Sequence, residues 1–319
     1  MLGHVGPAAY HDAMQLTDPQ RRTLDRLIGT GERPVFAADL RQRLVDRIEG
    51  AARELELREP LWLGKEALNK LAKCEGRFAA KLAGEDPPFE HSLNTAAGVL
   101  AHKAIEVDVG ARDALDPHAI ATIAADRLAE REERFAEYWR ERSAPERDEV
   151  LMEVVRKVTL FQGSFPPLRE IRRELAPVTE LLFRNELLGG VLTISGKVDL
   201  VLGMPDRLEP GRATRLAVDL KTGGAWPEYA EDMRFYALLM TLRFGVPPYR
   251  VASLFLDSGE WQAEEVGEET LFHAADRVVS AARAASALLG GREPVLTPGS
   301  WCAWCPRAFF CPSAEPRPA

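Results

Sequence analysis

Two short β-like segments in the second half of the chain each carry an aliphatic face and an acid on the opposite face. The aliphatic faces, read at a period of two residues, comprise Leu216, Val218 and Leu220 in one segment and Val198, Leu200 and Leu202 in the other. The opposite faces comprise Ala217, Asp219 and Lys221, and Lys197, Asp199 and Val201. If the two segments pair as neighbouring strands, Asp199, Asp219 and Lys221 meet on one face of a sheet.

The order of the other elements places these strands in an α/β fold. Helical periodicity dominates from residue 18 to about residue 175. After residue 177 come the β-like segments, a helix over PEYAEDMRFYALLMTLRFG, two strand segments (VASLFLD and residues 260–266) and a last helix over EETLFHAADRVVSAARAASALLGG. This order predicts a mixed central sheet flanked by helices.

Composition excludes some partners and restricts others. No stretch approaches the about 18 consecutive apolar residues of a membrane span, and the first residues lack the basic and apolar regions of a signal peptide. We therefore expect a soluble cytoplasmic protein with no membrane partner. The formal net charge of -8 at pH 7 argues against a chain-wide attraction to nucleic acid, so any nucleic-acid groove must be local.

Asp199, Asp219 and Lys221 together predict a hydrolytic site for phosphodiesters. Two neighbouring carboxylates repel each other unless a hard divalent cation lies between them, and Mg²⁺ prefers carboxylate, water and phosphate oxygens. Such an ion polarises a phosphoryl oxygen and lowers the pKa of a bound water, while an ammonium stabilises the growing negative charge. The alternative is a surface ion pair between Asp219 and Lys221 on an edge strand, which would not need a buried aliphatic backing.

These segments resemble the motifs of the PD-(D/E)XK nuclease superfamily, specifically its RecB-like branch. Residues 196–199 (GKVD) match the G-x-x-D strand, and residues 218–223 (VDLKTG) match the D-x-K-T-G strand. Upstream, residues 98–106 (GVLAHKAIE) resemble the G-x-x-x-H helix. The resemblance covers residues 70 to 312, and its strand motifs are more specific together than singly.

The resemblance implies a restriction-endonuclease-like core and roles for four side chains. Asp199, Asp219 and Lys221 are the expected catalytic residues. His102, Asp199 and Asp219 are the expected ligands of Mg²⁺ or Mn²⁺. Outside the family context, a histidine on a helix is more often a satisfied or exposed side chain than a metal ligand.

Two positions depart from the family pattern. Val198 stands where the superfamily name has a proline, which is common in the RecB-like branch. In the helix after the D-x-K-T-G strand, the family has a glutamine upstream of a tyrosine. Tyr236 matches the tyrosine and is the expected DNA contact, whereas Asp232 occupies the glutamine position. Asp232 in place of the glutamine affects the expected DNA contact of this helix but leaves the expected metal site unchanged.

Four cysteines form a second constellation, with Cys74 far upstream and Cys302, Cys305 and Cys311 close together near the C-terminus. Zinc sites usually draw their ligands as two close pairs, which this spacing does not match. The arrangement is compatible with a [4Fe–4S] cluster and resembles the iron staple of AddB-type and CRISPR-associated RecB-like nucleases. The alternative is a set of buried free thiols. A cluster would stabilise the fold by closing a very long loop.

Aromatic residues lie among the C-terminal cysteines. They are Trp301, Trp304, Phe309 and Phe310. We expect them to form a dry wall that shields the sulfur atoms from water. After Cys74, Phe78 supplies the aromatic residue of the family pattern, while Glu75 replaces its proline.

The leading hypothesis is a metal-dependent DNA nuclease, a RecB-like exonuclease that acts on single-stranded DNA or DNA ends in repair, recombination or defence. One competing hypothesis is a non-catalytic DNA-binding or scaffold subunit of a helicase–nuclease complex. Another is a redox protein that uses the cluster for electron transfer. The chain lacks the G-x-x-x-x-G-K-[ST] motif, so any helicase partner is on another chain.

The expected division of the chain into domains is a helical N-terminal extension over residues 1–65 and a nuclease domain over residues 66–319.

Overall fold

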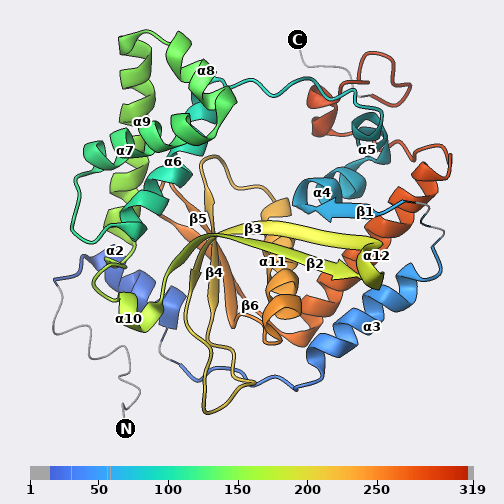
Figure 1. The fold of residues 1–319 in the computed structure, drawn as a ribbon, viewed down its shortest axis with the longest axis horizontal. Coiled ribbons are helices and arrows are strands. Elements are labelled where there is room, and N and C mark those ends of the chain that lie inside the picture. Colours follow the sequence, from blue (N-terminus) through green and yellow to red (C-terminus); the bar gives the residue numbers. More distant parts are fainter. Residues whose placement is uncertain (1–14, 30, 56, 58, 315–319) are drawn as a thin grey trace.

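A mixed sheet of six strands forms the centre of the molecule, and helices cover both of its faces (Figure 1). The computed structural model describes residues 15–314 except residues 30, 56 and 58. Residues 1–14 of the expected N-terminal extension and residues 315–319 of the expected nuclease domain lie outside this described part. The mixed sheet flanked by helices confirms the predicted α/β fold class.

The strands are ordered β1-β3-β4-β5-β6, and β2 pairs with β3 as well. Their bounds are Leu61–Gly64 (β1), Val178–Leu187 (β2), Leu192–Leu202 (β3), Leu216–Lys221 (β4), Arg250–Phe255 (β5) and Trp261–Glu265 (β6). β3 is antiparallel to β2 and β4 and parallel to β1, whereas β5 is parallel to β4 and antiparallel to β6. The two acid-bearing segments are therefore neighbouring antiparallel strands, as expected.

Strand β3 has different partners along its two halves. β2 pairs with it between Leu192 and Val201, β1 pairs with residues 192–195, and β4 pairs with residues 200–202. Because β2 occupies one edge of β3, β1 and β4 share the other edge, and residues 196–199 lie between them. The candidate site forms at this opening in the sheet.

Helices connect the strands and enclose the sheet. Before β2 they are α2 (Asp18–Arg22), η1 (Thr23–Gly29), α3 (Leu40–Ala52), α4 (Lys65–Lys73), α5 (Glu75–Leu82), α6 (Leu93–Gly110), α7 (Pro117–Arg131), α8 (Glu133–Glu141), α9 (Ala144–Ser164) and α10 (Arg172–Leu175). After β2 they are η2 (Leu188–Gly190), α11 (Glu228–Phe244), α12 (Glu268–Leu289) and η3 (Ser300–Trp304).

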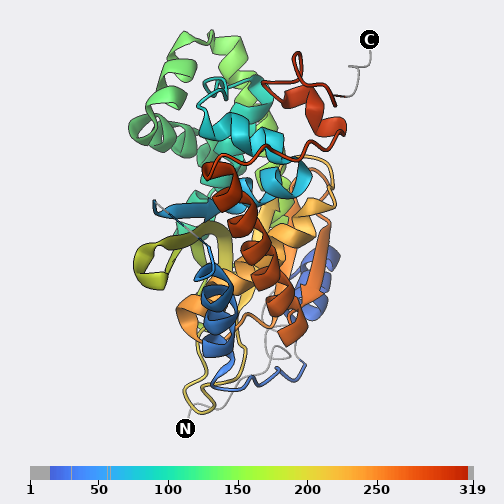
Figure 2. The same cartoon turned by 90° about the vertical axis from the view of Figure 1, so that its right-hand side faces the viewer.

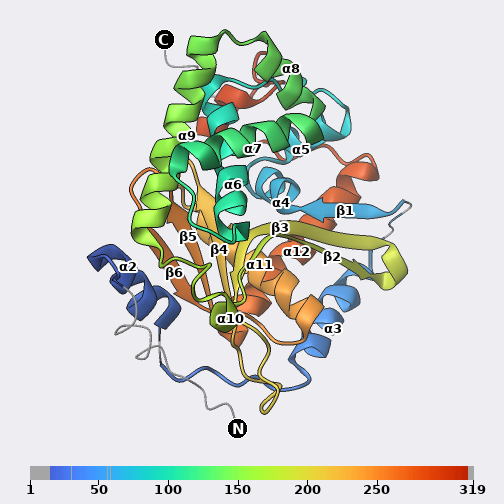
Figure 3. The ribbon, with the colours of Figure 1, turned by 60° about the vertical axis from the view of Figure 1, so that its left-hand side comes forward.

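Two hydrophobic cores cover opposite faces of the sheet. α3, α4, α11 and α12 pack over the face that carries Ala217, and η1, α6 and α9 pack over the face that carries Val218. A third core, which includes Phe135, holds α6, α7, α8 and α9 together as a helical lobe beside the sheet (Figure 3). Burial of these faces is the main favourable contribution to folding.

The N-terminal helices pack into the cores of the sheet. Leu44 of α3 is fully buried in one core, and Leu27 of η1 is fully buried in the other. The Tyr249 hydroxyl, next to β5, donates a hydrogen bond of 2.7 Å to the carbonyl oxygen of Ile28. Among the described residues, no helix combines the length and apolar character needed to cross a membrane.

Helices dominate residues 18–175 as expected, and β1 is a strand within this region that the sequence did not predict. Leu61 and Leu63 alternate with the exposed Trp62, but four residues are too few to show a period in the sequence. The strand is stabilised by parallel pairing with the distant β3.

The expected face of Val198 is wrong. Val198 packs in the core with Ala217, whereas Leu200 packs in the opposite core. The change of face coincides with an irregularity at the intervening position. There Glu180 of β2 has a φ of 54° and lies, unpaired in the register, between the pairs of Thr179 with Leu200 and Leu181 with Val198.

Candidate active site

Asp199 and Asp219 lie where β3 and β4 stop pairing. The pair of Leu200 with Val218 is the last in the register, so the two acids are the next residues on their strands. Asp199 Oδ2 accepts a hydrogen bond of 2.7 Å from the backbone N–H of Leu220. The two acids are only 8% and 3% exposed. A side chain thus replaces the missing backbone pairing and keeps two buried carboxylates together.

Lys221 completes the group on β4. Its ammonium forms an ion pair with Asp219 Oδ2 and lies 3.7 Å from the centroid of the Tyr229 ring. Lys221 is buried, and β4 lies between β3 and β5 inside the sheet. The alternative of an ion pair on an exposed edge strand is therefore wrong.

Helix α6 brings His102 to the two acids. His102 Nδ1 lies 3.3 Å from Asp199 Oδ1. The approach of α6 depends on Gly98, one turn earlier, since a Cβ at this position would lie only 3.0 Å from Oγ1 of Thr222. The G-x-x-x-H helix and the end of the D-x-K-T-G strand therefore touch directly.

The four predicted side chains line one cavity of about 970 Å³. Residues of β3 and β4 form one wall, and residues of α6 and α7 from the helical lobe form another. The structure thus brings together residues that are 119 positions apart in the chain, from His102 to Lys221.

Glu180 is a further acid of the site, which the sequence reasoning missed. One ligand atom each from His102, Glu180 and Asp199 lies within 4.8 Å of the others, an arrangement that could hold a metal ion. Glu180 also forms an ion pair with Lys197. The register of the β2–β3 hairpin is the signal that could have found Glu180, since the pairs on either side put this residue at the level of Asp199.

The electrostatics of the site reflect crowded negative charge. Burial and then repulsion by Asp199 raise the pKa of Asp219. Burial also opposes ionisation of Asp199, but His102 and the Leu220 N–H outweigh it and lower the pKa of Asp199. Burial lowers the pKa of His102, yet the carboxylates of Asp199, Asp219 and Glu180 outweigh it, so this pKa is raised. A divalent cation relieves such competition between neighbouring acids.

Comparison with known protein families agrees with this geometry. A family model described as the PD-(D/E)XK nuclease superfamily matches residues 65–312, which is most of the chain. The chain belongs to the PD-(D/E)XK nuclease superfamily. Membership of this superfamily implies a hydrolase that acts on phosphodiester bonds, and a divalent metal ion at the site.

Similarity to individual proteins is weak. A candidate exonuclease from Eubacterium rectale is 13% identical with a TM-score of 0.47, over 81% of this chain and 91% of that chain. The crystal structure of SSO0001 is 12% identical with a TM-score of 0.36, over 87% of this chain and 96% of that chain. No curated protein matches the sequence.

The residues of this PD-(D/E)XK site fit a divalent cation. Carboxylates and an imidazole are ligands that Mg²⁺ or Mn²⁺ accepts. Asp219 Oδ2 is buried beside the Lys221 ammonium and accepts no hydrogen bond of good geometry within the described residues, so a lone pair remains available to a metal. Among the described residues, the ligand atoms gathered closely enough to share one ion are those of His102, Asp199 and Glu180. Asp219, an expected ligand, is the neighbour of Asp199 on β4 but does not belong to this group.

Tyr236 lies beneath the cavity rather than on the open surface. It is 2% exposed, and burial, followed by the charges of Asp219 and Asp199, raises the pKa of its hydroxyl. The family glycine at position 196 makes room for this ring, because a Cβ there would lie 3.0 Å from Tyr236 Cε1. Asp232, one turn earlier on α11, is buried as well.

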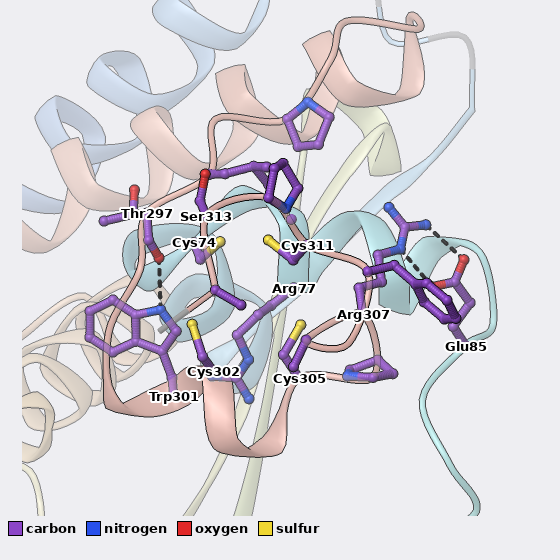
Figure 4. Close-up of a pocket in the computed structure, with 18 of the residues that line it drawn as sticks. Cys74, Arg77, Glu85, Thr297, Trp301, Cys302, Cys305, Arg307, Cys311 and Ser313 are labelled. Atoms are coloured by element: carbon purple, nitrogen blue, oxygen red, sulfur yellow. Dashed lines mark hydrogen bonds and ion pairs between the residues drawn. The ribbon is translucent and has the colours of Figure 1, made fainter. Parts of the chain in front are cut away.

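The four cysteines line a second cavity of about 700 Å³. Figure 4 shows the sulfur atoms of Cys74, Cys302, Cys305 and Cys311 facing a common space. Among the described residues, no three of these sulfur atoms lie within 4.8 Å of one another. The sulfur atoms are therefore not gathered, in this structure, as closely as the ligands of a single ion.

The C-terminal segment after α12 returns to α5 (Figure 2). Cys74 directly precedes this helix as its N-cap. Glu75, which replaces the proline of the family pattern, accepts a hydrogen bond of 2.8 Å from the backbone N–H of Val295 and forms an ion pair of 2.8 Å with Arg292. Arg307 is similarly paired with Glu85 at 2.6 Å (Figure 4). These contacts fix the two cysteine-bearing segments against each other.

The expected aromatic wall around the cysteines is wrong. Trp304, Phe309 and Phe310 are 72%, 88% and 84% exposed, and only Trp301 is half-buried. Residues three apart eclipse each other in a 3₁₀ turn, so Cys302 and Cys305 of η3 and its cap face inward together, and Trp304 points elsewhere.

Proposed function

We propose that this PD-(D/E)XK protein is a metal-dependent DNA nuclease of the RecB-like, AddB-related type. It would act as an exonuclease on single-stranded DNA or DNA ends, in repair, recombination or defence, in the cytoplasm. The observation that carries the proposal is the convergence of His102, Asp199, Asp219 and Lys221 on one cavity at the opening of the sheet. A helicase on another chain is the partner we expect to supply the strand.

The chemistry follows from the order of the groups. A divalent cation held by His102, Asp199 and Asp219 would polarise the scissile phosphate and acidify a bound water. Lys221, held against Asp219, would stabilise the negative charge that develops on the phosphate. Burial strengthens this interaction, since the ammonium acts in a medium of lower dielectric than water. The DNA contact expected of Tyr236 would use the part of its ring that lines the cavity.

The second part of the proposal is a [4Fe–4S] cluster held by Cys74, Cys302, Cys305 and Cys311. Two observations support it: all four cysteines line one cavity, and the sequence contains no other cysteine. Its role would be structural, because it would join α5 to the C-terminal segment and close a nuclease domain over residues 66–319. Residues 1–65 would form an N-terminal extension of that domain, and its described part is mainly helical up to β1.

The test is cleavage of a 5′-labelled single-stranded oligonucleotide and its duplex with Mg²⁺ or Mn²⁺. We expect the natural protein to cleave and Asp219→Ala to lose activity by at least about 100-fold. The matched control is Asp276→Ala, which removes an exposed acid on α12 that is paired with Arg47. DNA binding without cleavage under any divalent metal would instead select the non-catalytic scaffold subunit.

A further inference from the structure

A second lysine lies in the catalytic cavity, and neither the motifs nor the mechanism above uses it. Lys65 is the first residue of α4, lines the cavity, and has a side chain that is 36% exposed. Its ammonium lies 5.4 Å from the centroid of the Tyr236 ring and 3.9 Å from Asp232 Oδ2. In the part of the chain that the structure describes, Asp232 is the only carboxylate within 4.0 Å of this ammonium.

Asp232 is the acid that occupies the family's glutamine position, and it is 2% exposed. Its Oδ2 lies 3.9 Å from the ammonium groups of both Lys65 and Lys221. Its Oδ1 accepts a hydrogen bond of 2.9 Å from Asn69 Nδ2, and Arg277 in turn donates to Asn69 Oδ1 at 2.5 Å. A buried carboxylate is tolerated only when nearby groups compensate its charge. The ammonium groups of Lys65 and Lys221 therefore help to stabilise the ionised Asp232 in its buried position.

The position of Asp232 determines where Lys65 can lie. The ammonium of Lys65 is attracted by Asp199 and Asp219 as well, and both acids are buried metal-ligand candidates. Asp232 offers a negative charge on the α11 side of the cavity and holds Lys65 there. A neutral glutamine would offer no such attraction. With its partner 3.9 Å away, Lys65 keeps N–H donors for a ligand that enters the cavity.

We propose that Lys65 binds a backbone phosphate of the nucleic acid next to the scissile phosphate, and that Asp232 is the positioning residue for Lys65. The inference rests on the proposed nuclease function and deepens it. Because the chain has a net charge of -8, binding of nucleic acid requires local cationic side chains, and Lys65 would be one of them. Lys221 serves the scissile phosphate, whereas Lys65 binds the strand without taking part in bond cleavage.

The first experiment measures binding of a fluorescein-labelled oligothymidylate by anisotropy, in EDTA and over a range of salt concentrations. We expect Lys65→Met to raise the Kd about fivefold or more and to lower the salt slope by about 0.7, the value for one phosphate contact on a single strand. Lys65→Arg keeps the charge and should restore most of the affinity.

The matched control is Lys103→Met. Lys103 also borders the cavity, but its ammonium is paired with Glu106 at 2.5 Å. This variant removes the same charge from the same region and should change the Kd less than about twofold. Equal changes in Kd and salt slope for Lys65→Met and Lys103→Met would overturn the proposal, provided that thermal unfolding shows both variants folded.

The second experiment tests the positioning role of Asp232. Asp232→Asn keeps the shape of the side chain and an oxygen for Asn69, so the fold should persist. In this background, Lys65→Met should raise the Kd less than it does in the natural protein, because Lys65 is already displaced. In cleavage assays, Lys65→Met should raise KM and leave kcat within about twofold. An undiminished effect of Lys65→Met in the Asp232→Asn background would refute the positioning role.

The two levels of failure are distinguishable. If the natural protein neither binds nor cleaves nucleic acid, the proposed nuclease function is wrong and the role of Lys65 is wrong with it. If the natural protein cleaves and depends on Asp219, but Lys65→Met behaves like Lys103→Met, only the inference about Lys65 is wrong.

Discussion

Asp199 accepts a hydrogen bond of 2.7 Å from the backbone N–H of Leu220, the residue between Asp219 and Lys221. The bond connects β3 and β4 beyond their last backbone pair. One carboxylate therefore serves the sheet through one oxygen and faces His102 through the other. Asp199 therefore contributes to both cleavage and fold stability. Different substitutions of Asp199 should change the cleavage rate and the free energy of unfolding to different extents.

Asparagine and alanine at position 199 should separate these two contributions. Asp199→Asn keeps an oxygen for the Leu220 N–H and loses the charge, so we expect cleavage to fall by at least about 100-fold with little change in stability. Asp199→Ala also leaves a buried N–H without a partner, so it should lose an additional 1–3 kcal/mol of unfolding free energy, as an order of magnitude. Denaturant unfolding and Mn²⁺-dependent cleavage measure the two effects. Equal stability of the two variants would contradict the structural role of the hydrogen bond.

Lys221 should be essential for cleavage but not for metal binding. Lys221→Met removes the ammonium that is paired with Asp219 while keeping a similar buried volume. We expect cleavage to fall by roughly 100-fold or more, and Mn²⁺ affinity by calorimetry to stay equal or increase, since an ammonium no longer competes for Asp219. Lys81→Met, on the exposed side of α5, is the control. If Lys221→Met lost Mn²⁺ affinity together with cleavage, the proposed role of Lys221 in stabilising the phosphate charge would be contradicted.

We expect Glu180 to lower the stability of the fold through its strained backbone while its carboxylate strengthens metal binding. Its φ of 54° lies in the left-handed region, which is strained for most residues with a side chain and which glycine adopts without steric strain. We expect Glu180→Gly and Glu180→Gln both to weaken Mn²⁺ binding, because each removes a carboxylate from the site. Glu180→Gly should nevertheless be more stable than Glu180→Gln by about 1 kcal/mol. Calorimetry with Mn²⁺ and thermal unfolding without metal test the pair, and unchanged Mn²⁺ affinity in both variants would remove Glu180 from the site.

The cysteine cavity should contain iron and sulfide in protein purified without oxygen. We expect about four iron and four sulfide ions per chain and no stoichiometric zinc. Cys74→Ser should lose the iron and lower the Tm, because the C-terminal segment is then no longer tied to α5. Phe309→Ser, at an 88% exposed position beside the cysteines, is the control. One equivalent of zinc, or an unchanged Tm in Cys74→Ser, would contradict the cluster.

Tyr249 should make the protein sensitive to alkaline pH. Burial raises the pKa of its hydroxyl to about 12, although Arg33 and Arg250 oppose the rise. In the unfolded chain this pKa is about 10, so the stabilisation is complete below pH 10 and is lost as the pH rises toward 12. Tyr249→Phe also removes the hydrogen bond to Ile28, which costs about 1 kcal/mol at neutral pH. Urea unfolding between pH 8 and about 12 should show a flatter decline for Tyr249→Phe than for the natural protein.

Local patterns were sufficient to predict the centre of the site. Strand alternation is a property of adjacent residues, so Asp219 and Lys221 could be placed on one face directly. The proximity of Asp199 to them followed from two neighbouring strands of similar pattern, and the structure pairs these strands up to Leu200 and Val218, the residues next to the two acids. The family motifs added His102, and the structure places it 3.3 Å from Asp199.

Long-range packing decided the rest. The approach of α6 to β4 depends on a contact between Gly98 and Thr222, and the position of Glu180 depends on the register of a hairpin. Neither the helix–strand contact nor the hairpin register can be predicted from the sequence pattern of one segment alone. The exposure of Trp304 was mispredicted for the same reason, since aromatic composition does not say which side of a turn faces a cavity.

The sequence by itself determined which groups this protein has for chemistry: two acids and a lysine on neighbouring strands, a histidine on a helix, and four cysteines. Only the tertiary structure decided that β1 and β4 separate along one edge of β3, which opens the cavity at Asp199. It alone placed Lys65 and Asp232 in contact at that cavity. The physical reason is that a chain specifies side-chain faces through local geometry, whereas distances between faces are set by the packing of elements far apart in sequence.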